Sequence, residues 1–246
     1  MSNQEPLFAV WLSTPNVAAA EIAADLGYAS AVLDIEHGAF DLAALDRFVP
    51  FLRGLGIEVL AKVLAPERGP IQQALDFGAD AVIIPHILGV AHAREVCAFA
   101  KFPPAGDRSF AGGRTTRYGG FDDEWVARQD RMTRCLPMIE DDMAIREVDE
   151  ILALANVDGV FVGPSDLSLR RGRGAYGRTE DDFADLSLVA EAAAKAAKPW
   201  ILPAWSAAER AFANAHGAST IVTVMEHSAI EVGFRLALSQ ARERAS

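Results

Sequence analysis

The chain has 246 residues, of which 51% are hydrophobic and 23% are charged, and its formal net charge is −11. This acidic balance, without any basic run, argues against a nucleic-acid partner, because proteins bind phosphates through clustered Lys and Arg. No stretch approaches about 18 uninterrupted apolar residues, so we expect no membrane partner. The two widely separated cysteines, Cys97 and Cys135, are expected to be reduced thiols in a cytoplasmic protein.

Short apolar runs alternate with longer amphipathic segments along the whole chain. The apolar runs have the composition of strands buried on both faces: Phe8–Ser13, Ala31–Glu36, Val59–Leu64, Ala81–Ile87, Arg134–Glu140, Gly159–Gly163, Trp200–Ala204 and Thr220–Met225. A helical period is present between them: Asn16–Leu26, Leu42–Leu55, Pro70–Phe77 and Asp182–Ala197. A glycine follows several of the helical segments, where a left-handed C-cap is expected: Gly27, Gly56, Gly78 and Gly217. Eight βα units predict an α/β fold, a closed (β/α)8 TIM barrel that forms a single domain over residues 1–246.

Two long segments rich in Gly and Arg interrupt this alternation, Phe102–Asp122 and Ser165–Thr179. Each follows a strand unit, so in a barrel we expect both near the carboxyl-terminal rim. Long loops in compact domains are often functional, although contact between subunits is an equal alternative. Arg170, Arg171 and Arg173 could bind an acidic aldehyde or pair with carboxylates across an interface.

Polar residues recur where the predicted strands end, which is where barrel enzymes place their chemistry. Burying charged groups there is costly unless they are paired or bound to a ligand. In chain order they are Trp11, Ser13, Asp34, Glu36, His37, Lys62, His86, Glu140, Ser165, Asp166, Trp205, Glu226 and His227. This recurrence is the main evidence within the sequence for an active site.

Two carboxylates from neighbouring strands, Glu140 and Asp166, could hold a hard divalent ion and leave positions for water and a chelating substrate. The alternative is that they cap helices, since acidic residues often occupy helix starts. Asp34 and His37 could form a carboxylate–imidazole pair that acts as a general base, or His37 could be structural.

Lys62 interrupts an apolar strand, and three interpretations of it remain open. It could be a fixed positive charge at the mouth of the barrel, a desolvated amine for Schiff-base chemistry, or a lysine whose ammonium reaches solvent. The Gly163-Pro164-Ser165 turn could offer backbone N–H groups to a carboxylate or enolate oxygen, or could simply be a tight turn.

Several segments together resemble the HpcH/HpaI aldolase family, the class II pyruvate aldolases. The resemblance extends from Phe8 to about Leu238 and is carried by Val10–Ser13, Leu33–His37, Leu75–Gly78, Phe102–Arg108, Ile139–Glu140 and Val162–Ser168.

The resemblance implies a metal-dependent aldolase that joins or cleaves a 2-oxo acid, pyruvate or hydroxypyruvate, and an aldehyde. By this resemblance Glu140 and Asp166 ligate Mg2+, Mn2+ or Co2+, and the Gly163-Pro164-Ser165 turn and Trp11 bind the substrate. The catalytic residues are His37 with Asp34, which move a proton, and Lys62. Glu36 and Asp76 support the site indirectly, Asp76 from an adjacent subunit.

The resemblance also implies a homo-oligomer, a hexamer built as a dimer of trimers, in which neighbouring subunits exchange the last helix, Ala229–Arg244. The chain departs from the family at three places. Lys62 replaces the usual arginine, Met138 replaces the usual glutamine, and Val224-Met225-Glu226 replaces a Gly-x-Asp segment. Alternative functions are related enolate chemistry, as in a decarboxylase or a citrate-lyase-like acyl-CoA lyase, a Schiff-base aldolase using Lys62, and a non-catalytic binding barrel.

Overall fold

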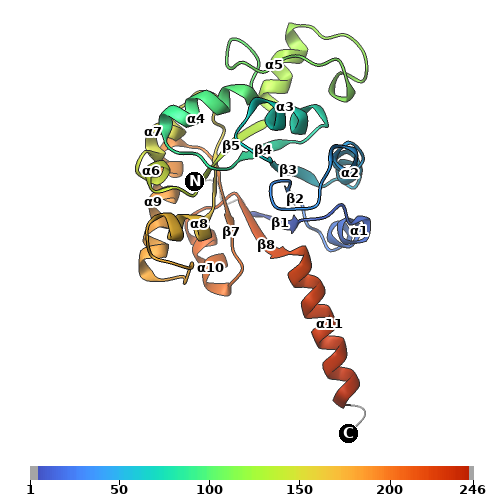
Figure 1. Ribbon diagram of the computed structural model, residues 1–246, viewed down its shortest axis with the longest axis vertical. Helices are drawn as coiled ribbons and strands as arrows, with labels where there is room; N and C mark the ends of the chain where they lie inside the picture. Colours follow the sequence, from blue (N-terminus) through green and yellow to red (C-terminus); the bar gives the residue numbers. More distant parts are fainter. Residues whose placement is uncertain (1–4, 244–246) are drawn as a thin grey trace.

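The computed structural model describes residues 5–243, and its eight parallel strands close into a barrel in the order β1 to β8. The strands are β1 Leu7–Leu12, β2 Ser30–Asp34, β3 Glu58–Lys62, β4 Ala81–Ile84, β5 Arg134–Ile139, β6 Val160–Val162, β7 Trp200–Pro203 and β8 Thr220–Met225. Figure 1 shows the strands at the centre with most of the helices around them. The prediction of a TIM barrel is therefore confirmed.

Eleven α-helices and two short 3-10 helices connect the strands within the described residues. They are α1 Val17–Asp25, α2 Leu42–Gly54, α3 Arg68–Asp76, α4 Val90–Cys97, η1 Ala98–Ala100, η2 Arg114–Thr116, α5 Asp123–Met132, α6 Asp142–Arg146, α7 Val148–Leu152, α8 Pro164–Arg170, α9 Glu180–Ala196, α10 Ala207–Ala215 and α11 Glu226–Glu243. The glycines predicted to end helices have positive φ: Gly27 +90°, Gly56 +80°, Gly78 +101° and Gly217 +71°. This left-handed conformation carries no Cβ penalty in glycine, and it turns the chain into the next strand.

Side chains alternate between two cores, as the two faces of each strand require. Along β1, Ala9 and Trp11 point into the barrel, whereas Val10 and Leu12 pack against the surrounding helices. The barrel interior is filled by packed apolar side chains: Ala9, Trp11, Val32, Leu60, Ala81, Ile83, Leu136, Met138, Phe161, Ile201 and Val222. These side chains fill the interior of the barrel, so we expect a substrate to bind at the rim and not inside.

The register between β2 and β3 places Asp34 directly beside Lys62. Both residues end their strands, and both are buried. Two residues that are far apart in the sequence thus become neighbours at the carboxyl-terminal rim, where the predicted site lies.

Several predicted boundaries differ from the structure, and β3, for example, ends at Lys62 rather than Leu64. β2 ends at Asp34 rather than Glu36, and β4 ends at Ile84 rather than Ile87, because the chain turns away from the sheet there. The segment Ser165–Thr179, predicted to be a loop, begins inside helix α8. Pro164 and Asp166, both in the first helical turn, are helix-start signals that account for this difference.

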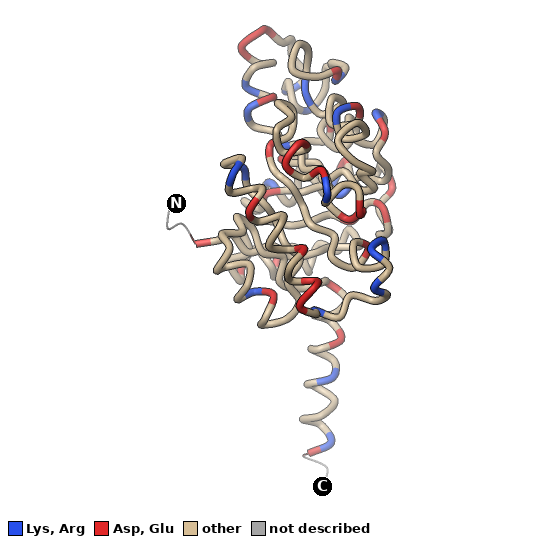
Figure 2. The backbone as a smooth tube through the Cα atoms, turned by 90° about the vertical axis from the view of Figure 1, so that its left-hand side faces the viewer, with Lys and Arg blue, Asp and Glu red and all other residues tan. Residues whose placement is uncertain are grey.

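The last helix, α11, points away from the barrel instead of packing on it (Figures 1 and 2). It spans Glu226–Glu243, whereas the predicted helix was Ala229–Arg244, whose last residue lies outside the described part of the chain. Its apolar side chains are exposed, among them Phe234 at 74%. Within residues 5–243, no helix has the length and apolarity needed to cross a membrane.

Candidate active site

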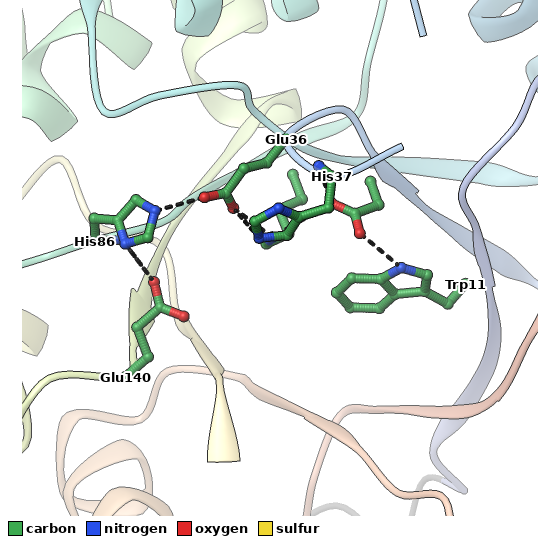
Figure 3. Close-up of polar contacts among 7 residues, drawn as sticks. Trp11, Glu36, His37, His86 and Glu140 are labelled. Carbon is green, nitrogen blue, oxygen red and sulfur yellow. Dashed lines mark hydrogen bonds and ion pairs between the residues drawn. The ribbon is translucent and has the colours of Figure 1, made fainter. Parts of the chain in front are cut away.

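Polar side chains from β1 to β5 meet at the carboxyl-terminal rim, and Figure 3 shows their arrangement. Glu36 lies between the imidazoles of His37 and His86, and His86 in turn faces Glu140. A single polar network therefore extends from the β2 turn to the end of β5.

Lys62 is held between two carboxylates. Its ammonium group donates to Asp34 Oδ1 at 3.3 Å and to Glu36 Oε2, and it lies 5.9 Å from the centroid of the Trp11 ring. The side chain is only 5% exposed. Two anionic partners around a buried lysine favour the interpretation of Lys62 as a fixed positive charge over a free amine.

Glu36 is the centre of this network. Beyond its bond to Lys62, its Oε1 lies 2.5 Å from His86 Nε2, and its Oε2 lies 3.5 Å from His37 Nε2. Burial alone would raise the pKa of Glu36, but the hydrogen bond and charge of Lys62, together with the two imidazoles, lower the pKa below its ordinary value. Glu36 is therefore ionised, and it contacts the Lys62 ammonium and the His86 and His37 imidazoles.

Asp34 organises the rim through three different donors. Besides the Lys62 ammonium, its carboxylate accepts from Trp11 Nε1 at 3.2 Å and from the backbone N–H of His37 at 3.2 Å. The sequence predicted pairing of Asp34 with the His37 ring, but that ring faces Glu36. The His37 side chain is 68% exposed, which leaves it open to solvent and substrate.

Glu140 follows β5 directly and is buried at the rim. Its Oε1 accepts from the backbone N–H of His86 at 2.7 Å, and its Oε2 takes no hydrogen bond from residues 5–243. Burial raises the pKa of the Glu140 carboxyl above its ordinary value, and the negative charge of Asp166 adds to the rise, although the His86 N–H opposes it. Glu140 and Asp166 thus repel each other electrostatically, which favours a cation between them.

Gly163 allows the end of β6 to approach Glu140. A Cβ at this position would lie 2.6 Å from Met138 Cε and 2.8 Å from Glu140 Oε2. Gly163 caps α8, and Ser165 and Asp166 occupy the first turn of that helix, where backbone N–H groups have no intrahelical acceptor. Both side chains are exposed, so the turn presents donors and a carboxylate to the rim.

The donors available for a metal are the oxygens of two carboxylates. Among residues 5–243, no group of three or more His, Cys, Asp and Glu side chains could hold an ion. Mg2+ and similar hard ions commonly use one or two carboxylates and complete their shell with water and substrate. Three features fit that donor set: Glu140 Oε2 has no hydrogen bond, the missing Cβ of Gly163 leaves space beside it, and the charge of Asp166 is nearby.

His86 was predicted only as one of the polar residues at strand ends, with no role assigned to it. It lies two residues beyond β4, has a φ of +57° and contacts both Glu36 and Glu140. A left-handed conformation in a residue with a Cβ costs about 1–2 kcal/mol, so the surrounding contacts hold it there. The sequence signal available was a histidine directly after a proline at a strand end, which indicated position but not contacts.

Three groups predicted near the site have other partners. Asp76 ends α3, away from the rim of its own barrel, and accepts from Arg108 Nη2 at 2.8 Å. Glu226 accepts four hydrogen bonds from the loop between β1 and α1, so it fastens that loop. The arginines after α8 pair with carboxylates of their own chain: Arg171 with Asp142 and Asp185, and Arg173 with Asp182 and Asp185.

The sequence profile of the HpcH/HpaI aldolase/citrate lyase family matches residues 7–226. The chain belongs to this family. A hydroxypyruvate/pyruvate aldolase of Roseobacter denitrificans is 31% identical over 174 residues, which cover 70% of this chain and 68% of that protein. A 2-keto-3-deoxy-L-rhamnonate aldolase of Salmonella gallinarum is 30% identical over 165 residues, which cover 66% of this chain and 61% of that protein.

A solved HpcH/HpaI aldolase from Desulfitobacterium hafniense superposes with a TM-score of 0.89 at 25% identity, covering 97% of this chain and 93% of that one. With the family and the aldolase relatives, this makes the chain an aldolase, a carbon–carbon lyase. The resemblance drawn from the sequence is confirmed.

Proposed function

We propose that the protein catalyses reversible aldol addition and cleavage between pyruvate or hydroxypyruvate and an aldehyde, with a divalent ion at Glu140 and Asp166. The observation that carries the proposal is the buried Glu140 carboxylate, which has one oxygen free beside Gly163 and the charge of Asp166 nearby. The names of the relatives from Roseobacter and Salmonella support a 2-oxo acid as the substrate class.

Mg2+, Mn2+ or Co2+ bound at these carboxylates would supply Lewis-acid polarisation of the keto group of the substrate. The residues of the chain then provide binding and proton transfer. Lys62 sets a positive charge beside the site, where it offsets negative charge that develops on the 2-oxo acid. Ser165 and the first turn of α8 offer backbone N–H groups to the acid, and Gly163 and Pro164 shape that turn.

Proton transfer is assigned to His37. Its exposed ring faces Glu36, whose ionised carboxylate stabilises the protonated imidazole, and Asp34 fixes the backbone from which the ring projects. Trp11, bonded to Asp34, forms the wall beside Lys62. In this arrangement Glu36, rather than Asp34, tunes the general base.

The alternatives have weaker support. A Schiff-base aldolase needs a neutral amine, and the two carboxylates that contact Lys62 favour the ammonium form. A lyase acting on an acyl-CoA ester would need free basic groups near the rim, yet Arg171 and Arg173 are engaged by Asp142, Asp182 and Asp185.

We also propose that α11 is exchanged between subunits, within a hexamer arranged as a dimer of trimers. The helix leaves its own barrel with Phe234, Val232 and Leu236 more than half exposed. Such an apolar surface is unusual for a monomer and typical of an interface. Asp76, which lies far from its own rim, is then available to a neighbouring site. The buried free thiols of Cys97 and Cys135 support a cytoplasmic location.

The test uses protein stripped of metal, incubated with pyruvate or hydroxypyruvate and a panel of short aldehydes. Adduct formation is measured with and without Mg2+, Mn2+ or Co2+ for the wild type, Glu140→Gln, and Asp149→Asn as an exposed carboxylate control. Activity that returns with metal and is lost only in Glu140→Gln supports the proposal. Activity that is indifferent to both treatments refutes the metal role, and no activity with any pair redirects the search to acyl-CoA esters.

A further inference from the structure

A cavity of about 510 Å³ lies at the opposite end of the barrel from the active site. Its walls come from the ends of α2 and α3, from the residues before β4, and from η2 and α5. These are the connections that lead into strands, so the cavity belongs to the amino-terminal face. In Figure 1, α5 and the chain before it form the lobe beside α3.

Four arginines line this cavity, Arg53, Arg114, Arg117 and Arg128, and Asp80 is the acidic residue among the lining residues. Such a gathering of positive charge is unexpected in a chain with a net charge of −11. Positive charges gathered on one surface raise the local electrostatic potential and so favour the binding of anions.

The charges are only partly balanced within the chain. Arg53 lies 3.3 Å from Asp80, and Arg114 donates to Asp46 Oδ1 at 2.6 Å. The side chains of Arg117 and Arg128 have neither a hydrogen bond nor an ion pair with any residue in the range 5–243. Both residues are exposed, so their guanidinium charges are solvated and available to an anionic ligand.

The carboxyl ends of α2 and α3 also face this region, and their partial negative charges favour an arginine at the position of Arg53. The helix ends do not account for Arg117 and Arg128. Arg117 comes from the loop after η2, and Arg128 comes from the middle of α5. In addition, Arg114 Nε is buried without a hydrogen-bond partner in the described chain, so a ligand that supplied an acceptor there would be favoured.

The rest of the lining indicates the kind of molecule that would fit. Trp125 and Leu75 provide apolar walls, and Thr116 and Gln129 provide neutral hydrogen-bonding groups. A volume of about 510 Å³ is within the range of small-molecule sites. Guanidinium groups bind carboxylate and phosphate oxygens in pairs, with good geometric specificity.

We propose that this cavity is a binding site for a small organic dianion, a phosphate monoester or a dicarboxylate, separate from the active site. Arg117 and Arg128 match its two charges, and Arg114 and Arg53, already paired, shape the entrance. The proposal does not depend on the metal chemistry at the other end of the barrel.

The test measures binding by isothermal titration calorimetry on metal-free full-length protein, with inorganic phosphate and succinate as separate probes. The variants are Arg117→Asn, which suits the left-handed conformation at this position (φ 53°), and Arg128→Gln. Arg131→Gln is the matched control, because Arg131 is an exposed arginine on the same helix that does not line the cavity.

We expect saturable binding of at least one probe, with one site per chain and weaker affinity as potassium chloride is raised. Each variant should weaken that binding on the order of tenfold, and Arg131→Gln should leave it unchanged. Two results would overturn the proposal. One is no saturable heat with either probe, or equal affinity in all variants. The other is a change in molar mass by light scattering in the variants with no anion binding, which would make the cavity a contact between copies.

Discussion

The substitution Glu36→Gln removes one charge from the centre of the site while keeping the shape of the side chain. In the native protein Glu36 contacts the Lys62 ammonium and lies close to the imidazoles of His86 and His37. The amide can still accept a hydrogen bond from Lys62, but it no longer neutralises it. Because the side chain is 9% exposed, solvent replaces little of the lost interaction.

The size of the effect follows from the partners that remain. Removing one partner of a buried ion pair costs about 3–5 kcal/mol, because the other charge stays buried without compensation. Lys62 keeps Asp34 at 3.3 Å, so we expect a smaller loss, about 2–3 kcal/mol in the free energy of unfolding. In a chain of this length that corresponds to a fall of roughly 4–12 °C in the melting temperature.

The same loss should depend on pH in a defined direction. The folded protein lowers the pKa of Glu36, so the ionised carboxylate stabilises the fold above the ordinary glutamate range. That contribution disappears as the pH falls through the lowered pKa. The difference between wild type and Glu36→Gln should therefore be full at about pH 7 and shrink at about pH 4 and below.

Urea unfolding followed by circular dichroism measures both quantities. Asp149→Asn is the control, because it removes the same charge from the exposed Asp149–Lys195 pair, which should cost less than about 1 kcal/mol. Equal losses for the two variants would refute the central role assigned to Glu36. So would a difference that stays constant or grows as the solution is acidified.

Three further predictions concern the proposed metal site at Glu140 and Asp166, Lys62, and α11. Gly163→Ala should weaken Mn2+ binding by about tenfold or more, because the new Cβ would displace Glu140 Oε2. Electron paramagnetic resonance measures this binding. Gly54→Ala is the control and should leave the binding unchanged, because a Cβ at position 54 meets nothing within 4 Å. Borohydride reduction in the presence of pyruvate should give no covalent mass increase that depends on Lys62, and an adduct lost in Lys62→Arg would contradict the ion-pair argument. Phe234→Glu should lower the molar mass measured by light scattering, and an unchanged mass would remove α11 from the interface.

The barrel could be predicted from the sequence because each strand is an apolar run. Its side chains point alternately into the barrel and toward the surrounding helices, and both sides are apolar cores. The predicted strand ends were less accurate. Glu36 and Ile87 were placed in strands as the ends of apolar runs, whereas β2 ends at Asp34 and β4 at Ile84. The loop predicted from Ser165 began instead as α8, although Pro164 and Asp166 are ordinary helix-start residues. There the abundance of Gly and Arg further along the segment outweighed a correct local signal.

The contacts of the site were harder to predict than its members. Position at a strand end indicated Asp34, Lys62 and Glu140, but not which side chains would touch. The contact between Lys62 and Asp34 follows from the β2–β3 register, and the contact of His86 with Glu36 depends on a backbone angle of +57°. Neither quantity can be read from residue types alone, so the sequence named Asp34 as the partner of His37, whereas the His37 ring lies 3.5 Å from Glu36.

The charges at the rim explain why these residues need one another. Four carboxylates lie there, those of Asp34, Glu36, Glu140 and Asp166, and Lys62 neutralises only part of their charge. Lys62 forms ion pairs with Asp34 and Glu36, and it lowers the pKa of Glu36. Burial raises the pKa of Glu140, and the negative charge of Asp166 adds to the rise, although the backbone N–H of His86 opposes it. A divalent cation at Glu140 and Asp166 would reverse that rise and complete the charge balance, while His86 links the two halves of the site through Glu36.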